Sequence, residues 1–363
     1  MKKIPLILSL ILIISLLAGC AGTPVVYYTD CTCPADAHVA SPVVDPTDAP
    51  EAPVLTEGAL KTGLAISTSL KKSTSATAEA EGVADYDVTM VAVLVDDNGI
   101  IHDCIIDGIA SSVSFDANGA FIGDLTAAPQ TKNELGENYG MVAWGGAIAE
   151  WDAQAAALAN FAVGKTVEEL RSGAVSESGY APEGSDLASS ATIYLGGYVS
   201  AIEAAVTNAQ HLGAQTGDTL KLGTITGIGD STTASAEKDG AAQLNVDVTA
   251  LTMNGETITS CMIDSVQAKV AFDATGTITS DVTAPVATKN ELGDNYGMVA
   301  WGGAKAEWNE QAASFAAYVT GKTADEVAGI AITEATKPAD ADLAASVTIS
   351  VIGFMNLIAK AAK

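Results

Sequence analysis

The sequence predicts an α+β fold made of two tandem homologous units, each with antiparallel hairpins packed against helices. In each half of the chain, apolar strand-like segments separated by tight turns come first, and helical segments with one apolar face follow. Residues 131–151 and 288–308 are identical at 19 of 21 positions. The repeat period, near 157 residues, is the size of a whole domain. The sequence therefore indicates a tandem duplication and not a solenoid.

The first 20 residues have the pattern of a lipoprotein signal. Lys2 and Lys3 precede an apolar run that ends in Leu17-Ala18-Gly19-Cys20. The run is short for a transmembrane anchor, which is the alternative, and the Leu-Ala-Gly-Cys ending indicates cleavage. We expect residues 1–19 to be a signal peptide and Cys20 to carry lipid. The protein would then be anchored at the extracellular face of the cell membrane.

Residues 20–58 are predicted to be a disordered, proline-rich tether. Six of the eleven prolines lie there, among Ala, Val, Thr and Asp. Such a composition does not bury enough apolar surface to order a chain. Cys31, Cys33 and His38 also lie in this segment. A Cys-x-Cys pair in a tether is only a weak signal for metal or redox chemistry.

Two units follow, at residues 59–211 and 212–363. Their short connection, which contains Gly213 and Gly217, keeps them near each other, and we expect them to move as separate domains. In the first unit we predict the strand Val88–Val95 and a hairpin turn at Asp97-Asn98-Gly99. The further predicted strands are Ile100–Ile106, Ser111–Phe115 and Ala120–Leu125.

Helices complete each unit. An alanine-rich helix is expected at about Ala147–Val163. Thr166 with Glu169, and Thr323 with Glu326, have the spacing of capping boxes at helix starts. The last helix of each unit has apolar residues every three or four positions. These positions are Leu195, Tyr198, Val199, Ile202 and Val206 in the first unit, and Val351, Phe354, Met355 and Ile358 in the second.

A short motif precedes each closing helix. It is DLASSAT at Asp186–Thr192 and DLAASVT at Asp342–Thr348. We expect Ser189 or Ser190 to be the helix N-cap and Thr192 to lie in the first helical turn. Unpaired N–H groups and the helix dipole would favour a phosphate there. An ordinary N-cap is the alternative for one copy, but the repetition favours a functional motif.

The motif resembles the flavinylation motif of the FMN-binding domain family. In that family a flavin transferase of the ApbE type moves FMN from FAD onto the last threonine, which forms a phosphoester. The resemblance implies two tandem FMN-binding domains with FMN attached to Thr192 and Thr348. In the second copy, Ala345 and Val347 replace the first copy's serine and alanine. The other motif residues that the resemblance implies to bind the cofactor are Asp186, Ser189, Ser190 and Ala191 in the first unit, and Asp342, Ser346 and Val347 in the second.

The duplicated stretch supplies further candidates for a flavin pocket. Aromatic side chains could stack on the isoalloxazine ring, and lysines could face a phosphate or a reduced anionic ring. Ordinary core packing is the alternative for each of them. The candidates are Lys132, Tyr139, Met141 and Trp144 in the first unit, and Lys289, Tyr296, Met298 and Trp301 in the second.

The lipoprotein signal, the tether and the duplication together resemble two-domain flavinylated lipoproteins of Gram-positive extracellular electron transfer. This resemblance implies that electrons pass from a membrane quinone-linked donor through two flavins to extracellular acceptors such as ferric iron. It also implies that a signal-peptide fragment acts as a pheromone. A surface lipoprotein that binds a ligand or partner without redox chemistry is an alternative, and a wall-layer structural module is another.

Composition limits the partners and the redox centres. Acidic residues outnumber basic ones by 44 to 17, and the net charge is −27, which argues against nucleic acid as a partner. Cys104 and Cys261 occupy equivalent strand positions, and we interpret them as buried structural cysteines. The three histidines form no recurring ligand set. Lys305 replaces Ile148 near the proposed second pocket, and its ammonium group would stabilise an anionic reduced flavin and raise the potential of that flavin. We therefore expect electrons to move from the flavin on Thr192 to the flavin on Thr348.

Overall fold

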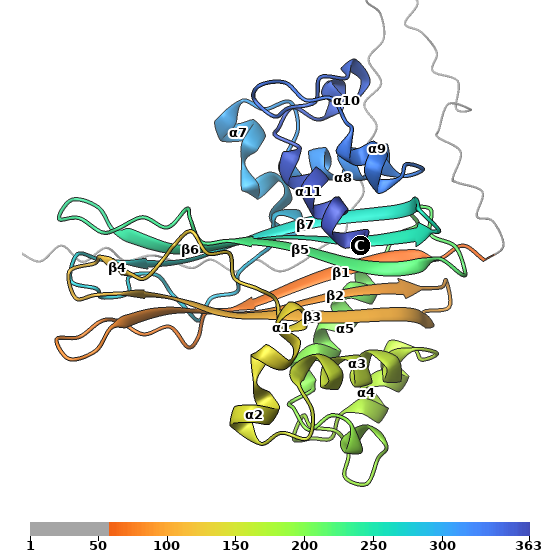
Figure 1. Ribbon diagram of the computed structural model, residues 1–363, viewed down its shortest axis with the longest axis horizontal. Helices are drawn as coiled ribbons and strands as arrows, with labels where there is room; N and C mark the ends of the chain where they lie inside the picture. The colour runs from red at the N-terminus through yellow and green to blue at the C-terminus, as the bar shows by residue number, and fades with distance from the viewer. Residues whose placement is uncertain (1–57) are drawn as a thin grey trace, which may run out of the picture. The chain divides into compact units, whose positions relative to one another are not determined.

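Two antiparallel sheets form the centre of the part of the chain that the computed structural model describes, residues 58–363 (Figure 1). In both sheets, strands adjacent in sequence are adjacent in space, as hairpins require. The first sheet contains β1 (Lys61–Ser69), β2 (Gly82–Val95), β3 (Ile101–Phe115) and β4 (Phe121–Ile122). The second contains β5 (Thr219–Gly227), β6 (Gly240–Asn254) and β7 (Thr257–Phe272).

The β2–β3 hairpin confirms the predicted turn and corrects the predicted strands. The Asp96 carboxylate accepts hydrogen bonds from the N–H groups of Asn98 and Ile100, which closes the turn. However, β3 runs unbroken through the region predicted as two strands. Asp107, which lies between the two predicted strands, is buried in β3 and accepts hydrogen bonds from the N–H groups of Gly108 and Asn133. The strands β1 and β5 were not predicted.

The burial pattern along β2 shows which parts of the sheet are covered. Residues 82–89 alternate between buried and half-buried positions, as expected for a strand covered on one face. Residues 90–95 are buried without a break, because the other sheet covers one face there and helices cover the other. A continuous apolar run in β2 therefore marks the segment under the helices.

The two halves share one hydrophobic core between their sheets, although the sequence predicted domains that move separately. The ring of Phe115 stacks on that of Phe272, with centroids 4.0 Å apart. The hydroxyls of Thr62 and Ser260 also form a buried hydrogen bond of 2.5 Å between the halves. Residues 58–363 therefore belong to one compact unit. Separate motion of the halves would expose apolar faces of both sheets, which are buried against each other here, so this shared core opposes the expected motion.

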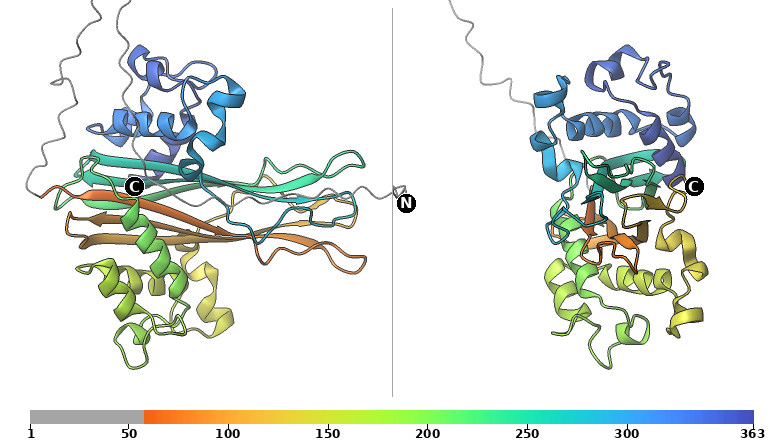
Figure 2. Two further views of the ribbon diagram at one scale, coloured as in Figure 1. Left: turned by 180° about the vertical axis from the view of Figure 1, so that it is seen from behind. Right: turned by 90° about the vertical axis from the view of Figure 1, so that its left-hand side faces the viewer.

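Helices cover the outer face of each sheet (Figure 2). They pack on the sheets through one apolar face, which forms a separate cluster in each half. The first half has α1 (Lys132–Leu135), η1 (Gly136–Tyr139), α2 (Met141–Gly145), α3 (Trp151–Ala162), α4 (Val167–Ala174), η2 (Leu187–Ser189) and α5 (Gly196–Thr207). The second has α6 (Lys289–Leu292), η3 (Gly293–Tyr296), α7 (Met298–Gly302), α8 (Trp308–Val319), α9 (Ala324–Ala328), α10 (Ala341–Ser346) and α11 (Ile352–Ala361).

The helix predictions are confirmed in part. Both predicted capping boxes are present, at Thr166 and Thr323. The alanine-rich helix begins at Trp151 and not near Ala147, because Gly146 is left-handed and ends the short helix before it. Within residues 58–363, no helix is long and apolar enough to cross a membrane.

Candidate functional site

The two motif threonines lie in loops and not in helices. Helix α5 begins at Gly196, four residues after Thr192, and its N-cap is Leu195, which makes no side-chain cap. Helix α11 begins at Ile352, four residues after Thr348. The prediction that these threonines occupy a first helical turn is therefore wrong.

A buried glutamine holds the first threonine in its loop. The Gln154 Oε1 atom accepts hydrogen bonds from the Thr192 N–H (2.8 Å) and the Thr192 hydroxyl (3.2 Å). It also accepts one from the Ile193 N–H (3.2 Å). The Gln154 Nε2 atom donates to the carbonyl oxygen of Ala149 (2.8 Å), which fixes the orientation of the amide. The backbone N–H groups that a helix would leave unpaired are thus satisfied by a side chain of α3.

The second half repeats three of these four hydrogen bonds. The Gln311 Oε1 atom accepts from the N–H (2.8 Å) and the hydroxyl (3.2 Å) of Thr348, and its Nε2 atom donates to the carbonyl oxygen of Ala306 (2.8 Å). Both glutamines are fully buried. Sequence reasoning missed them. The available signal was a glutamine three residues after Trp151 and Trp308, just beyond the duplicated stretch.

The other motif residues shape the loops. The Ser189 hydroxyl donates to the carbonyl oxygen of Asp186 (2.6 Å), and neither Ser189 nor Ser190 caps α5. Ala191 and Val347, which precede the two threonines, are buried in the helical clusters. The cap of α10 is Asp340 and not Asp342, because the Asp340 Oδ1 atom accepts from two N–H groups. The Ser346 hydroxyl donates to the carbonyl oxygen of Leu343.

The two candidate lysines are enclosed by aromatic rings. Lys132 Nζ lies 4.8 Å from the ring centroid of Trp151 and 5.5 Å from that of Tyr139. It is also 3.8 Å from the Asp87 carboxylate. In the second half, Lys289 lies in the same way over the rings of Trp308 (4.6 Å) and Tyr296 (5.3 Å). Burial lowers the pKa of both lysines. Cation–π contacts hold both ammonium groups against these rings.

Trp144 and Trp301 have the opposite environment, with 90% of each side chain exposed. Trp144 lies on the five-residue helix α2, whose Met141 and Val142 N–H groups donate to the Glu150 carboxylate. The Trp144 ring covers Gly140, where an added Cβ would lie 2.2 Å from the ring. The contacts of Met298, Val299 and Glu307 are the same in the second half. Each half thus presents one fixed indole to solvent.

In each half, candidate aromatic residues and residues of the threonine motif pack in the same helical cluster. Tyr139 and Met141 pack against the first helical cluster, to which Trp151 and Ala191 belong. Tyr296 and Met298 pack in the second helical cluster, with Trp308 and Val347. The structure therefore brings the tyrosines, the methionines and the threonine loops to the same helical layer.

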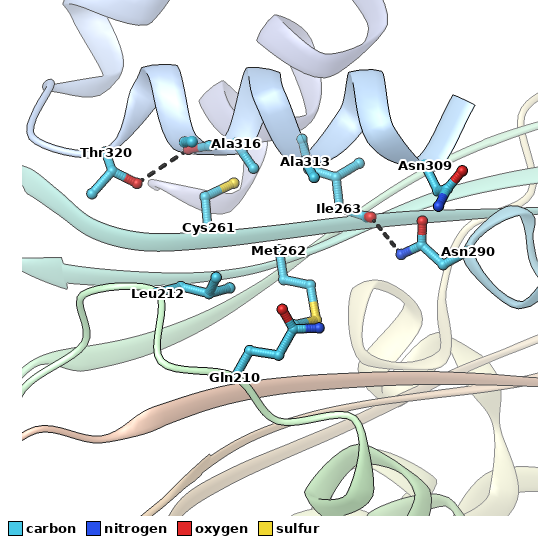
Figure 3. A pocket seen from close by; sticks show the side chains of 11 residues that line it. Gln210, Leu212, Cys261, Met262, Ile263, Asn290, Asn309, Ala313, Ala316 and Thr320 are labelled. Carbon is cyan, nitrogen blue, oxygen red and sulfur yellow. Dashed lines mark hydrogen bonds between the residues drawn. The ribbon is translucent and has the colours of Figure 1, made fainter. Parts of the chain in front are cut away.

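A separate cavity of about 330 Å³ lies in the second half and contains none of the predicted site residues (Figure 3). It lies between β7, α8 and the segment that joins the halves. Its lining has apolar and amide side chains and no charged one, and the buried Asn309 Oδ1 atom lacks a hydrogen-bond partner. The lining residues are Gln210, Leu212, Cys261, Met262, Ile263, Asn290, Asn309, Ala313, Ala316, Ala317 and Thr320.

The cysteines in the described residues fit a structural interpretation. Cys104 and Cys261 are buried and unpaired, and burial raises the pKa of both thiols. Across residues 58–363, no group of His, Cys, Asp and Glu side chains could hold a metal ion. Cys20, Cys31 and Cys33 lie outside the described residues.

Comparisons of this chain with known protein families, curated proteins and solved structures found no match. The fold is mixed, with two antiparallel sheets and helices on their outer faces. The site is defined by two equivalent threonine–glutamine pairs, one in each half.

Proposed function

We propose that this protein is a lipid-anchored extracellular flavoprotein that carries FMN on Thr192 and Thr348 through phosphoester bonds. It relays electrons from a membrane quinone-linked donor to extracellular acceptors such as ferric iron. One observation carries the proposal. Two threonines in a motif that resembles the flavinylation motif are held in the same way, each by a buried glutamine.

The environment of the threonines suits the attachment of a phosphate. Thr192 is exposed and Thr348 is half-buried, so a flavin transferase can reach their hydroxyls. Each hydroxyl donates its hydrogen to a glutamine oxygen, which leaves its lone pairs free to attack a phosphorus atom. In transfer from FAD, the phosphoanhydride bond would break, AMP would leave, and the hydroxyl proton would pass to the transferase or to water. The Thr–Gln hydrogen bond through the backbone N–H does not involve the hydroxyl and remains after modification. The loop thus stays fixed when the phosphoester forms.

The aromatic candidates support the proposal unequally. Trp144 and Trp301 present exposed rings at equivalent positions, which suits stacking on a flavin. Tyr139 and Tyr296 are already engaged by Lys132 and Lys289, and they contribute to the wall of the helical layer. Bound FMN supplies one- and two-electron transfer, and the protein's residues hold it and limit its contact with water.

Mass spectrometry tests the attachment directly. After co-expression with a flavin transferase of the ApbE type, the intact protein should gain the mass of two FMN groups. Thr192→Val and Thr348→Val should each remove one group, and the double variant should carry none. Visible flavin absorbance should survive denaturation. A Thr192→Val protein that keeps both adducts would overturn the assignment.

A small-molecule binding function without redox chemistry is the second candidate. The uncharged cavity beside α8 and the unpartnered Asn309 Oδ1 atom favour a small neutral ligand with a hydrogen-bond donor. This function requires no flavin. A colourless protein without adducts, after co-expression with the transferase, would favour it over the flavoprotein.

A further inference from the structure

The turns beside the two threonines are equivalent but carry different side chains. In the first half, the Ser176 N–H donates to the carbonyl oxygen of Tyr180 (2.8 Å). In the second, the Thr333 N–H donates to that of Lys337 (2.8 Å). Each turn also accepts a hydrogen bond from the start of the closing helix. These bonds run from Leu195 N to Gly179 O (2.8 Å) and from Val351 N to Thr336 O (2.9 Å).

These hydrogen bonds fix which residues correspond. Gly179 and Thr336 occupy the same backbone position, with φ of +81° and +58°. Tyr180 therefore corresponds to Lys337. Counting from the motif threonines, Tyr194 corresponds to Ser350.

Two tyrosines stand beside Thr192 in the first half. The Tyr194 ring covers Gly179, where an added Cβ would lie 2.2 Å from the ring. The same ring meets that of Tyr180 edge to face, with centroids 5.6 Å apart. Both side chains are about half exposed. Tyr194 is only two residues from Thr192, so this aromatic pair forms a wall at the edge of the first site.

The second half has no such wall. Thr336 occupies the position of Gly179, and its hydroxyl bonds to that of Ser350 at 2.6 Å. Threonine at positive φ is costly, and the position that Tyr194 fills in the first half holds Ser350 here. The next residue, Lys337, is exposed. Small hydroxyls and one ammonium thus replace the two rings.

At a third pair of corresponding positions, an apolar side chain of the first half is again replaced by a lysine in the second. Ile148, which is exposed in the first half, corresponds to the exposed Lys305 in the second. Lys305 precedes Ala306, whose carbonyl oxygen accepts from Gln311, and Gln311 accepts from Thr348. Two hydrogen bonds therefore connect the backbone beside Lys305 to Thr348. The second site gains two cations that the first lacks at corresponding positions.

We propose that the Thr348 site is where anionic oxidants take electrons, and that the tyrosine wall shields the Thr192 site from them. This inference rests on the proposed function. The net charge of −27 repels anions in general, so local cations decide where an anion approaches. Two one-electron ferric complexes each gain one electron from the reduced cofactor. Its two-electron oxidation releases its protons to water, and the quinone-linked donor supplies the electrons.

Fluorescence quenching tests the access of anions without any turnover. Thr192→Val leaves only the flavin on Thr348, and Thr348→Val leaves only the other. Iodide should quench the flavin on Thr348 roughly twofold or more strongly than the flavin on Thr192 at low salt, because the local potential concentrates anions. Lys305→Ile with Lys337→Tyr should remove this preference for iodide. In the Thr348→Val protein, the reciprocal substitutions Ile148→Lys and Tyr180→Lys should increase the quenching of the flavin on Thr192 by iodide. Quenching by neutral acrylamide should not change with Lys305→Ile alone or Ile148→Lys alone, because these single exchanges alter charge and leave the tyrosine wall unchanged.

Stopped-flow oxidation provides the second measurement. Ferricyanide should reoxidise the reduced Thr192→Val protein faster than the Thr348→Val protein, and salt should reduce the difference. The cationic oxidant hexaammineruthenium(III) should not share this preference. Equal iodide quenching at both sites, with adducts confirmed on both threonines, would overturn this inference alone. Absence of adducts would overturn the proposed function, and this inference with it.

Discussion

The Gln154 side chain accepts hydrogen bonds from both the backbone N–H and the hydroxyl of Thr192, 38 residues further along the chain. Gln154 lies on α3 and is fully buried, so the helix fixes the position of a loop hydroxyl. Gln311 and Thr348 have the same relationship. The chain thus contains two copies of one positioning device, and each copy is a control for the other.

Removal of the glutamine should affect only its own threonine. Gln154→Ala leaves the N–H groups of Thr192 and Ile193 without their acceptor, at a cost of about 1–3 kcal/mol if they stay buried. We expect less FMN on Thr192 and normal FMN on Thr348, as measured by peptide mass spectrometry. Gln311→Ala should give the reverse pattern. Equal loss at both threonines would show a global effect on folding and not on positioning.

The position of the exposed Trp144 ring on α2 should depend on Gly140, because a side chain at that residue would occupy the space of the ring. Gly140 has φ of +81° and lies under the Trp144 ring. Gly140→Ala should therefore displace the ring and cost about 1–2 kcal/mol for the left-handed backbone. Gly146→Ala is the matched control, because Gly146 is also left-handed, with φ of +62°, but an added Cβ there meets no atom within 4 Å. Urea denaturation and tryptophan emission measure both effects. Equal stability of the two variants would contradict the packing of Trp144 over Gly140.

The stability of the second half should contain a pH-dependent contribution from a buried carboxyl group. Burial raises the pKa of Asp264 to about 6. Between about pH 4 and 6 the folded state therefore binds more protons at this group than the unfolded state does. Stability from Asp264 falls as pH rises through this window, by on the order of 3 kcal/mol.

Asp264→Asn should lack this contribution, because its amide does not titrate. The stability of wild type minus that of the variant should therefore decrease between pH 4 and pH 7. Urea denaturation at several pH values measures this difference. Asn can still accept the hydrogen bonds from the N–H groups of Ser265 and Asn290. A difference that stays constant with pH would exclude titration of Asp264 in this range.

The shared core should make the two halves unfold together. Phe272 is fully buried and stacks on Phe115 of the other half. Phe272→Ala should cost about 3–5 kcal/mol through lost burial and a cavity. Hydrogen exchange, read by mass spectrometry, should show faster exchange in strands of both halves. Faster exchange confined to the second half would indicate two independent domains.

Local sequence signals predicted the elements whose structure depends on neighbouring residues. The hairpin turn after β2, the capping boxes at Thr166 and Thr323, and the buried face of α5 are all present. The positions of Thr192 and Thr348 were not predictable in this way. Their loops follow from hydrogen bonds to glutamines 38 and 37 residues away, and local N-cap patterns contain no information about such partners.

By itself, the sequence determined the duplication, the antiparallel hairpins followed by helices, and the candidate threonines. Repeats are found by comparing the sequence with itself, and periodicity is found within short segments, so neither requires knowledge of tertiary contacts. Only the tertiary structure decided that the two sheets bury a common core, since an apolar strand face does not specify what covers it. It also decided that Lys132 is enclosed by rings while Trp144 is exposed. Both residues lie in one duplicated stretch, and their opposite environments depend on the packing of segments far apart in the chain.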